Sequence, residues 1–359
     1  MGDFPRLASA VQRNCDISDA RHAGDYGLCS YLLKMREFYR WENELPFASK
    51  LPKDQLGEWL TQRERLWDDI EEDDLARLPL GEGEIDPFEA EIANRTLLPR
   101  GLVYSAGYGR LRKPMFFLAD LQRVEERSGF TVLVSSCEHA RELSAPPAML
   151  QGRTIFLRKE SLRRYLWEKV EEWQWRKLDN AMGRALVNYG FAADPDAALA
   201  RMAENEAETM ILHEVGEAMA GEMLGQAWPD WIVSTVPPRS EPFVRAVRDL
   251  LADCLSTLPG LLKAPNLPAL HFYFATFDAP RRQLFPQAMQ AYEHYVRDGR
   301  TDRLNRVAQE GAERWLNTAR GLIGLEPGAL EAALHGLLAE QETVSARSSQ
   351  IAPVAHGGS

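Results

Sequence analysis

The residues best suited to metal chemistry lie in one helical stretch near residue 213. His213 and Glu214 are followed by Glu217, within an apolar pattern at helical spacing between residues 202 and 225. At about 100° per residue, His213 and Glu217 share one face, and Glu206 lies two turns earlier on it. An imidazole and carboxylates on one face suit zinc, iron or manganese. We therefore predict metal ligands at these three positions, with Glu214 as the acid–base residue.

This pattern departs from two familiar helical metal motifs. Zinc peptidases carry His-Glu-x-x-His, but Glu217 stands here in place of the second histidine. Carboxylate-bridged iron and manganese proteins use Glu-x-x-His, which this helix lacks. The same residues would also fit the solvated face of an amphipathic helix, because apolar side chains line the opposite face. Metal-assisted hydrolysis and iron-dependent oxidation both stay open.

Two other histidines lie in stretches that could complete such a site. His22 belongs to a run in which Asp16, Asp19, His22 and Asp25 recur every three positions. A helix cap with a turn network would explain that run equally well. His271 begins an aromatic stretch that ends in Arg281 and Arg282, a pair able to hold an anionic group. A histidine in such a stretch is also typical of a hydrophobic core.

The cysteines predict reduced thiols. Cys15, Cys29, Cys137 and Cys254 are far apart and form no Cys-x-x-Cys pair. Without a secretory context, such cysteines are not expected to form a disulfide framework. A thiolate nucleophile at Cys15 or Cys137 is the alternative. Cys137 also lies two residues before His139, although no partner spacing supports a site there.

Composition and charge narrow the classes of function. The 359 residues are 45% hydrophobic and 26% charged, as in ordinary globular proteins, and the net charge is −11. This acidic balance repels phosphate backbones, so nucleic acid is not expected as a partner. Neither a nucleotide-binding glycine loop nor a Gly-x-Ser-x-Gly elbow occurs. With no signal peptide or long apolar span, we expect a cytoplasmic protein whose partner is a small molecule or another protein.

Periodicity predicts a mainly α fold with a small β-rich region (α+β), in which a short sheet is inserted into a helical bundle-like core. Helices are predicted over residues 27–42, 53–78, 162–186, 202–225 and 243–258, with others starting at 194 and between 286 and 342. Short β-branched and aromatic runs predict strands over residues 102–104, 115–118, 130–134 and 154–157. A turn at residues 127–129 would join two of them as a hairpin.

The chain is expected to contain three structured regions and a tail. These are an N-terminal helical region (1–95), a small strand-rich region (96–158), a C-terminal helical region (159–344) and a disordered tail (345–359). The three structured regions could equally form one continuous domain.

Four runs of this sequence resemble blocks of a family of uncharacterised bacterial proteins. The runs are residues 17–25 continuing through 32–37, residues 213–217, residues 251–253 with 255–259, and residues 270–275. The resemblance implies neither a reaction nor a fold. It does suggest that His22, His213, Glu217 and His271 belong to one site.

The hypothesis is thus a metal-dependent enzyme. His213 and Glu217 would hold a zinc, iron or manganese ion, and His22 or His271 would complete the site. The alternative is a non-catalytic helical adaptor that uses tryptophans as binding anchors. The tryptophans available for this are Trp41, Trp59, Trp67, Trp167, Trp173 and Trp175. Sequence alone does not decide whether catalysis occurs.

Overall fold

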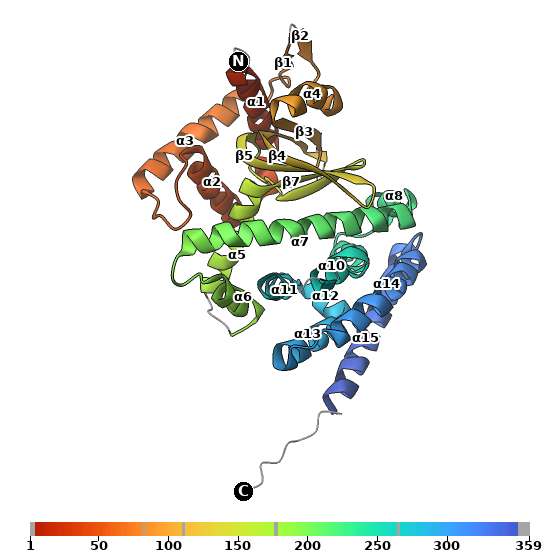
Figure 1. Cartoon of the computed structure of the whole chain (residues 1–359). Coiled ribbons are helices and arrows are strands. Elements are labelled where there is room, and N and C mark those ends of the chain that lie inside the picture. Colours follow the sequence, from red (N-terminus) through yellow and green to blue (C-terminus); the bar gives the residue numbers. More distant parts are fainter. Residues whose placement is uncertain (1–3, 82, 110–111, 176–178, 264–265, 351–359) are drawn as a thin grey trace. The chain divides into compact units, whose positions relative to one another are not determined.

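The computed structural model describes residues 4–81, 83–109, 112–175, 179–263 and 266–350, leaving aside the side chains of 342–350. Figure 1 shows its helices and strands, most of them labelled. The chain divides into two compact units, which are described separately. The first unit holds residues 1–177 and 189–210, and the second holds residues 178–188 and 211–359. The prediction of a mainly α fold with a small β-rich region is confirmed.

The first unit is built on a five-stranded sheet with the strand order β3-β4-β5-β7-β6. Only the pairing of β5 with β7 is parallel. The strands are β3 (Leu102–Tyr108), β4 (Pro114–Arg127), β5 (Phe130–Arg141), β6 (Ala148–Gln151) and β7 (Thr154–Arg158), and a separate pair is β1 (Leu78–Leu80) and β2 (Gly83–Ile85). The helices are α1 (Phe4–His22), α2 (Leu28–Glu42), α3 (Lys53–Ile70), α4 (Ala90–Leu97) and α5 (Lys159–Gln174).

Alternation along the strands gives this sheet two apolar faces. Phe116 and Leu118 of β4 pack with Val11 of α1 in one cluster. Phe117, between them, points the other way and packs with Leu133 in a separate cluster. Successive strand residues face opposite sides, so a strand buried on both faces carries a continuous apolar run. This is why the apolar runs of the sequence predicted β4 and β5.

The hairpin predicted at residues 127–129 joins β4 to β5. Arg127 pairs with Phe130 across a two-residue loop. Ser128 and Gly129 have φ values of 51° and 83°, both in the left-handed region. A loop with two left-handed residues matches the twist of the paired strands. The hairpin prediction is confirmed.

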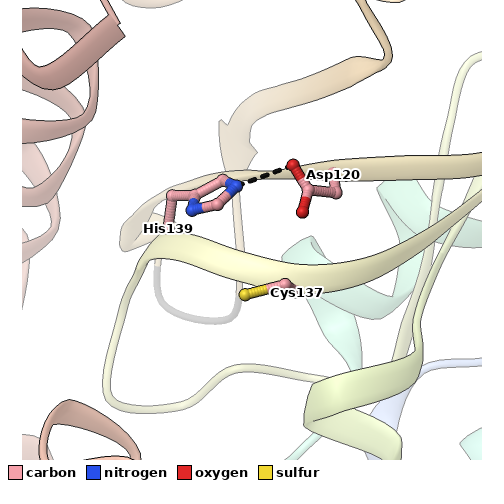
Figure 2. A group of neighbouring side chains, drawn as sticks. All are labelled: Asp120, Cys137 and His139. Atoms are coloured by element: carbon pink, nitrogen blue, oxygen red, sulfur yellow. Dashed lines mark hydrogen bonds and ion pairs between the residues drawn. The ribbon is translucent and has the colours of Figure 1, made fainter.

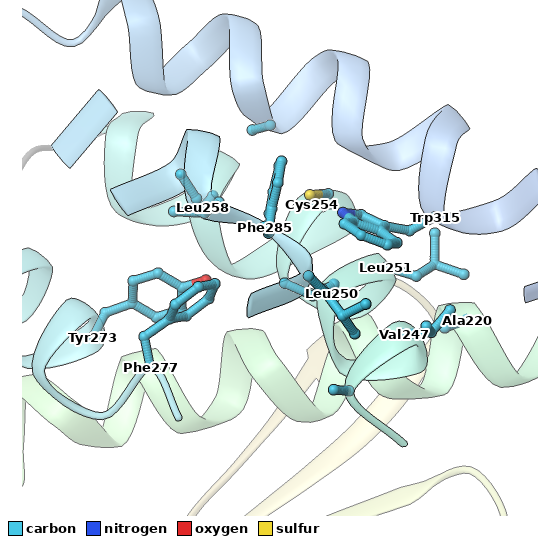
Figure 3. Packing of buried hydrophobic residues seen from close by; sticks show 14 of the residues in the cluster. Ala220, Val247, Leu250, Leu251, Cys254, Leu258, Tyr273, Phe277, Phe285 and Trp315 are labelled. Carbon is cyan, nitrogen blue, oxygen red and sulfur yellow. The ribbon is translucent and has the colours of Figure 1, made fainter. Parts of the chain in front are cut away.

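The second unit is helical. The first half of helix α7 (Pro195–Leu224) belongs to the first unit. Its second half, from residue 211, belongs to this unit. The other helices are α6 (Ala181–Tyr189), α8 (Ala227–Thr235), α9 (Glu241–Ala252), α10 (Leu258–Lys263), α11 (Leu267–Ala275), α12 (Ala279–Leu284), α13 (Pro286–Asp298), α14 (Asp302–Leu322) and α15 (Pro327–Gln350). Trp315 is fully buried in the core of this unit, together with Leu250, Cys254 and Phe285 (Figure 3).

Several helix boundaries differ from the predicted ones. The helix expected over 53–78 ends at Ile70, where an acidic run begins that opposes the negative end of the helix dipole. The helix expected over 162–186 is two helices, and Asn180 accepts a hydrogen bond from the Gly183 N–H at the start of the second. Helix α1 was not predicted, because several of its polar residues are buried rather than exposed.

Proline also acts differently from expectation at the end of α9. Pro259 was expected to end the helix over 243–258, but it is the second residue of α10. A proline has no N–H to donate, and the residue before it, Leu258, donates its N–H to the Asp253 carbonyl in a widened turn. Between α9 and α10 the chain makes a π-helical turn, Asp253–Thr257. At the other end of the chain, α15 continues to Gln350, inside the segment expected to be a tail, and residues 351–359 lie outside the described residues.

Candidate functional site

Helices α7 and α9 approach each other closely at Gly216. A Cβ on this glycine would lie only 2.3 Å from a backbone oxygen of α9, so the approach requires a glycine. His213 and Glu217 flank Gly216 on α7. Asp249 lies on α9, and Asp253 follows it at the start of the π-helical turn. Residues three or four positions apart share one helix face, so the contact brings these four side chains together.

The imidazole of His213 lies at the centre of this group. Its Nδ1 is 3.0 Å from Oδ1 of Asp253, and its Nε2 is 3.5 Å from Oε1 of Glu217. One donor atom each from His213, Glu217 and Asp249 lies within 4.8 Å of the other two. The side chains of these three residues are 24%, 20% and 25% exposed, so solvent reaches them. Asp253, by contrast, is buried.

Two arginines balance part of this negative charge. Arg248 places Nη2 2.7 Å from Oε1 of Glu217. Arg281 places Nη1 3.1 Å from Oδ2 of Asp253, and the Tyr273 hydroxyl donates a hydrogen bond of 3.0 Å to the same oxygen. Asp253 is therefore fixed by a cation and a hydroxyl on one oxygen and by the imidazole on the other. Arg281 does hold an anionic group, which is a carboxylate of this chain.

The carboxylates of the site differ in acidity. Burial, reinforced by the Glu217 carboxylate, raises the pKa of Glu214 to about 7. The same two causes raise the pKa of Asp249 to about 6. Burial acts on Glu217 too, but its hydrogen bond with His213 and the charge of Arg248 prevail and lower its pKa to about 2. The site thus holds a permanent carboxylate beside groups that exchange protons near neutral pH.

His213 and Asp253 stabilise each other in their charged forms. Burial alone would lower the pKa of the imidazole, but its hydrogen bonds to Asp253 and Glu217 hold that pKa well above the ordinary value. Burial likewise opposes ionisation of Asp253, yet the hydrogen bond from His213 keeps the pKa of this carboxyl below its usual range. A carboxylate on Nδ1 sets the orientation of the ring and directs Nε2 toward Glu217.

The other predicted ligands have different surroundings. Glu206 lies in the first unit, where its buried carboxyl accepts a hydrogen bond of 2.7 Å from the Tyr189 hydroxyl. Burial raises the pKa of Glu206 to about 8. His22 also lies in the first unit, with Nδ1 2.9 Å from a carboxylate oxygen of Asp25. The structure therefore groups His213, Glu214 and Glu217, while Glu206 and His22 make contacts of their own.

His271 lies in the second unit, but its contacts are with another part of it. Its Nδ1 is 2.8 Å from the hydroxyl oxygen of Tyr292, and the ring lines a cavity of about 420 Å³ beside Arg184. Burial lowers the pKa of His271, with help from the charge of Arg184. The imidazole is therefore neutral near pH 7 and belongs to the wall of that cavity.

Sequence reasoning missed the partners on α9. Asp249 and Asp253 have the same four-residue spacing as His213 and Glu217, within a stretch recognised as an amphipathic helix. That spacing was an available signal for a carboxylate pair on one helix face. Gly216, in the middle of the His-Glu-Val-Gly-Glu motif, was a signal for a close helix contact.

The cysteines proposed as thiolate nucleophiles lack the required acidity. Cys15 is buried, and burial raises the pKa of its thiol well above the ordinary value. Burial and the nearby carboxylate of Glu160 raise the pKa of Cys137 to about 11. A nucleophilic cysteine needs a lowered pKa and an electropositive setting, and neither thiol has them.

The protein is thus a mainly α protein that carries a partly exposed cluster of one histidine and several carboxylates. These features alone do not identify a reaction. The sequence profile for the N-terminal domain of a family of unknown function (DUF6866) matches residues 6–158, and the profile for its C-terminal domain matches residues 163–340. The chain therefore belongs to this family of unknown function. No curated protein and no solved structure matches it. Among the described helices, none has the length and apolar character needed to span a membrane.

Proposed function

We propose that this protein is a metal-dependent hydrolase whose ion is held by His213, Glu217 and Asp249, with Glu214 as the acid–base residue. The observation that carries the proposal is the convergence of one nitrogen and two carboxylate oxygens within 4.8 Å of one another, at positions that solvent reaches. A donor set of one imidazole and two carboxylates suits zinc, manganese or iron.

The contact between Asp253 and Nδ1 of His213 also supports this assignment. Histidines that bind metals commonly donate their other ring N–H to a carboxylate, which fixes the ring and raises its basicity. Asp253 accepts such a bond from Nδ1 of His213 at 3.0 Å, and Nε2 then faces the carboxylates. Asp253 is itself held by Tyr273 and Arg281, so the ring orientation does not depend on a bound ion.

The charge of the cluster also favours a divalent cation. Four carboxylates and two guanidinium groups lie together: Glu214, Glu217, Asp249, Asp253, Arg248 and Arg281. When an ion displaces the proton of His213 and all six of these groups are ionised, four negative charges less two positive ones leave a net charge of −2, which a divalent ion neutralises. His213 and Arg248 both contact Oε1 of Glu217.

Glu214 is the reason for preferring hydrolysis to oxidation. A divalent ion in this position would polarise a carbonyl or phosphoryl oxygen of the substrate. Glu214, with a pKa of about 7, is suited to accept the proton of an attacking water and return it to the leaving group. Iron-dependent oxidation has no need of this base. Of the tryptophans considered as anchors for the adaptor alternative, Trp67 and Trp167 are buried, whereas Trp175 is 79% exposed.

Metal content tests the site. The untagged protein is incubated with zinc, manganese or, without oxygen, ferrous iron, then freed of unbound ion and subjected to elemental analysis. We expect the wild type to hold about one ion per chain more than a folded His213→Ala, Glu217→Ala double variant. The control is His294→Ala, which removes an exposed imidazole of the same unit. Equal metal content in the wild type and the double variant would overturn the proposal.

The role of Glu214 is tested separately. Glu214→Gln keeps the size of the side chain and removes its acid–base function, so the variant should retain the ion. We expect it to hydrolyse p-nitrophenyl acetate or bis(p-nitrophenyl) phosphate about 10² to 10⁴ times more slowly than the wild type. Unchanged hydrolysis would remove Glu214 from the mechanism. Oxygen consumption by the iron-loaded protein, without ester hydrolysis, would instead support the oxidation.

A further inference from the structure

A second group of metal-binding side chains lies on the sheet of the first unit. Asp120 comes from β4, and Cys137 and His139 come from the neighbouring β5 (Figure 2). Nε2 of His139 is 2.8 Å from Oδ1 of Asp120. One donor atom from each of the three residues lies within 4.8 Å of the other two. A sulfur, a nitrogen and an oxygen thus converge on one point.

Two irregularities in strand pairing produce this convergence. On one side of Glu138, His139 is an extra residue of β5 with no partner on β4. On the other side, residues 136 and 137 of β5 together oppose Asp120 alone. Such bulges redirect side chains and increase the local twist, and they occur often beside functional sites. The three side chains thus lie where the strand pairing is irregular.

The residue between the two irregularities anchors the strand. Glu138 is buried and accepts hydrogen bonds of 3.0 and 2.9 Å from the guanidinium of Arg158. Cys137, by contrast, is exposed, and Asp120 and His139 are partly exposed. The ring of Phe4 packs edge-on against the imidazole of His139, with the ring centroids 4.9 Å apart. The buried Glu138 thus holds this part of β5 in place, while Asp120, Cys137 and His139 remain accessible to solvent.

We infer that Asp120, Cys137 and His139 form a zinc site, separate from the proposed hydrolase site. Zinc accepts thiolate, imidazole and carboxylate ligands together, and three protein ligands leave the fourth position to water or a ligand oxygen. Zinc binding releases the thiol proton of Cys137, and the resulting thiolate forms the bond to the ion. The donor set is softer than that of His213, Glu217 and Asp249, so the two sites should prefer different ions.

A catalytic cysteine–histidine pair would be the competing use of these residues. The Nε2 atom of His139 already contacts Asp120, and no hydrogen bond to the Cys137 thiol is found within the described residues. Although the Cys137 side chain is exposed, partial desolvation of its thiol and nearby carboxylates, Glu160 first among them, raise the pKa of this thiol to about 11. The negative surroundings that hold the proton on the thiol attract a cation instead.

Cobalt distinguishes this site from the proposed hydrolase site. Cobalt(II) bound to a thiolate gives a sulfur-to-cobalt charge-transfer band in the near ultraviolet, whereas the donors around His213 are only nitrogen and oxygen. We expect the full-length protein to show the band, and zinc to abolish it by displacement. Cys137→Ser should lose the band, and its zinc affinity should fall by at least about tenfold, as for the loss of a metal-site partner.

Control variants make either result decisive. Cys29→Ser removes the other exposed cysteine, and His213→Ala removes the other proposed site, so both should keep the band. Cys137 is exposed, so its serine variant should fold, which far-ultraviolet circular dichroism checks. Absence of the band in the wild type, or its persistence in Cys137→Ser, would overturn the inference without affecting the hydrolase proposal. Loss of the band in His213→Ala would also contradict it.

Discussion

Glu206 offers a quantitative test of how burial controls acidity in this protein. Its carboxyl group is fully buried, and the Tyr189 hydroxyl donates a hydrogen bond to Oε1. Its other oxygen, Oε2, is buried without a hydrogen-bond partner among the described side chains. Burial raises the pKa of Glu206 from an ordinary value of 4.5 to about 8, so the folded protein carries it neutral at pH 7. Glu206→Gln keeps the shape and fixes the side chain in a neutral form.

The sign of the effect follows from proton binding in the two states. The unfolded chain releases the proton above about pH 4.5, whereas the folded protein keeps it to about pH 8. Glu206 therefore contributes stability that is fully present below the unfolded pKa and is lost as pH rises through this window. At about 1.4 kcal/mol per pKa unit, the loss reaches about 3 kcal/mol at pH 7 and about 5 kcal/mol above pH 8. The Glu206→Gln variant does not undergo this pH-dependent loss of stability.

Urea unfolding, followed by circular dichroism in steps from about pH 5 to about pH 8, measures this difference. We expect the free energy of unfolding of Glu206→Gln to rise relative to wild type by about 1.4 kcal/mol per pH unit. The control is Glu204→Gln on the same helix, an exposed residue paired with Lys159. It should show no such trend. A wild-type-to-Glu206→Gln difference that does not change with pH would show that Glu206 ionises normally, and would refute the reasoning.

The close approach of α7 and α9 and the competition between ions and protons give two further tests. Gly216→Ala should lower the free energy of unfolding by about 1–3 kcal/mol, because its Cβ would meet a backbone oxygen. Gly221→Ala, with open space on the same helix, should instead raise it by up to about 1 kcal/mol. Both are measured by urea unfolding. The ion at His213 and Asp249 must displace protons, so its affinity should rise about tenfold per pH unit for each proton displaced. Zinc titrations of Cys137→Ser, which lacks the proposed thiolate ligand, near pH 6 and pH 7 check this, and a pH-independent affinity would contradict the site.

Sequence periodicity was a good guide wherever an element buries apolar residues on a regular face. It predicted α2, which begins one residue after the expected start, and the hairpin of β4 and β5. It failed for α1, whose buried residues include Asn14, Asp16 and Asp19. The pattern of apolar and polar residues carries no information on a polar residue that is buried with a partner far away in the sequence.

The candidate site shows the same limit. His213 and Glu217 could be paired from the sequence because they lie on one helix, one turn apart. Asp249 and Asp253 approach them only through the packing of a second helix at Gly216, which no spacing within one helix can indicate. Glu206 was grouped with them by the same helical spacing, but a helix face can change its surroundings over two turns. The two turns that separate it from His213 cross from one unit to the other.

The π-helical turn that starts at Asp253 limits which insertions and deletions related sequences can carry at this point. Such a turn holds one residue more than an α-helical turn, and each residue rotates a helix by about 100°. Here the extra residue lets Asp249 and Asp253 meet α7 while Leu258 and Leu261, after the turn, enter the core. A relative with one residue fewer at this point could keep one of these orientations but not both. An alignment gap at residues 253–257 should therefore separate the members of the family that retain the site from those that have lost it.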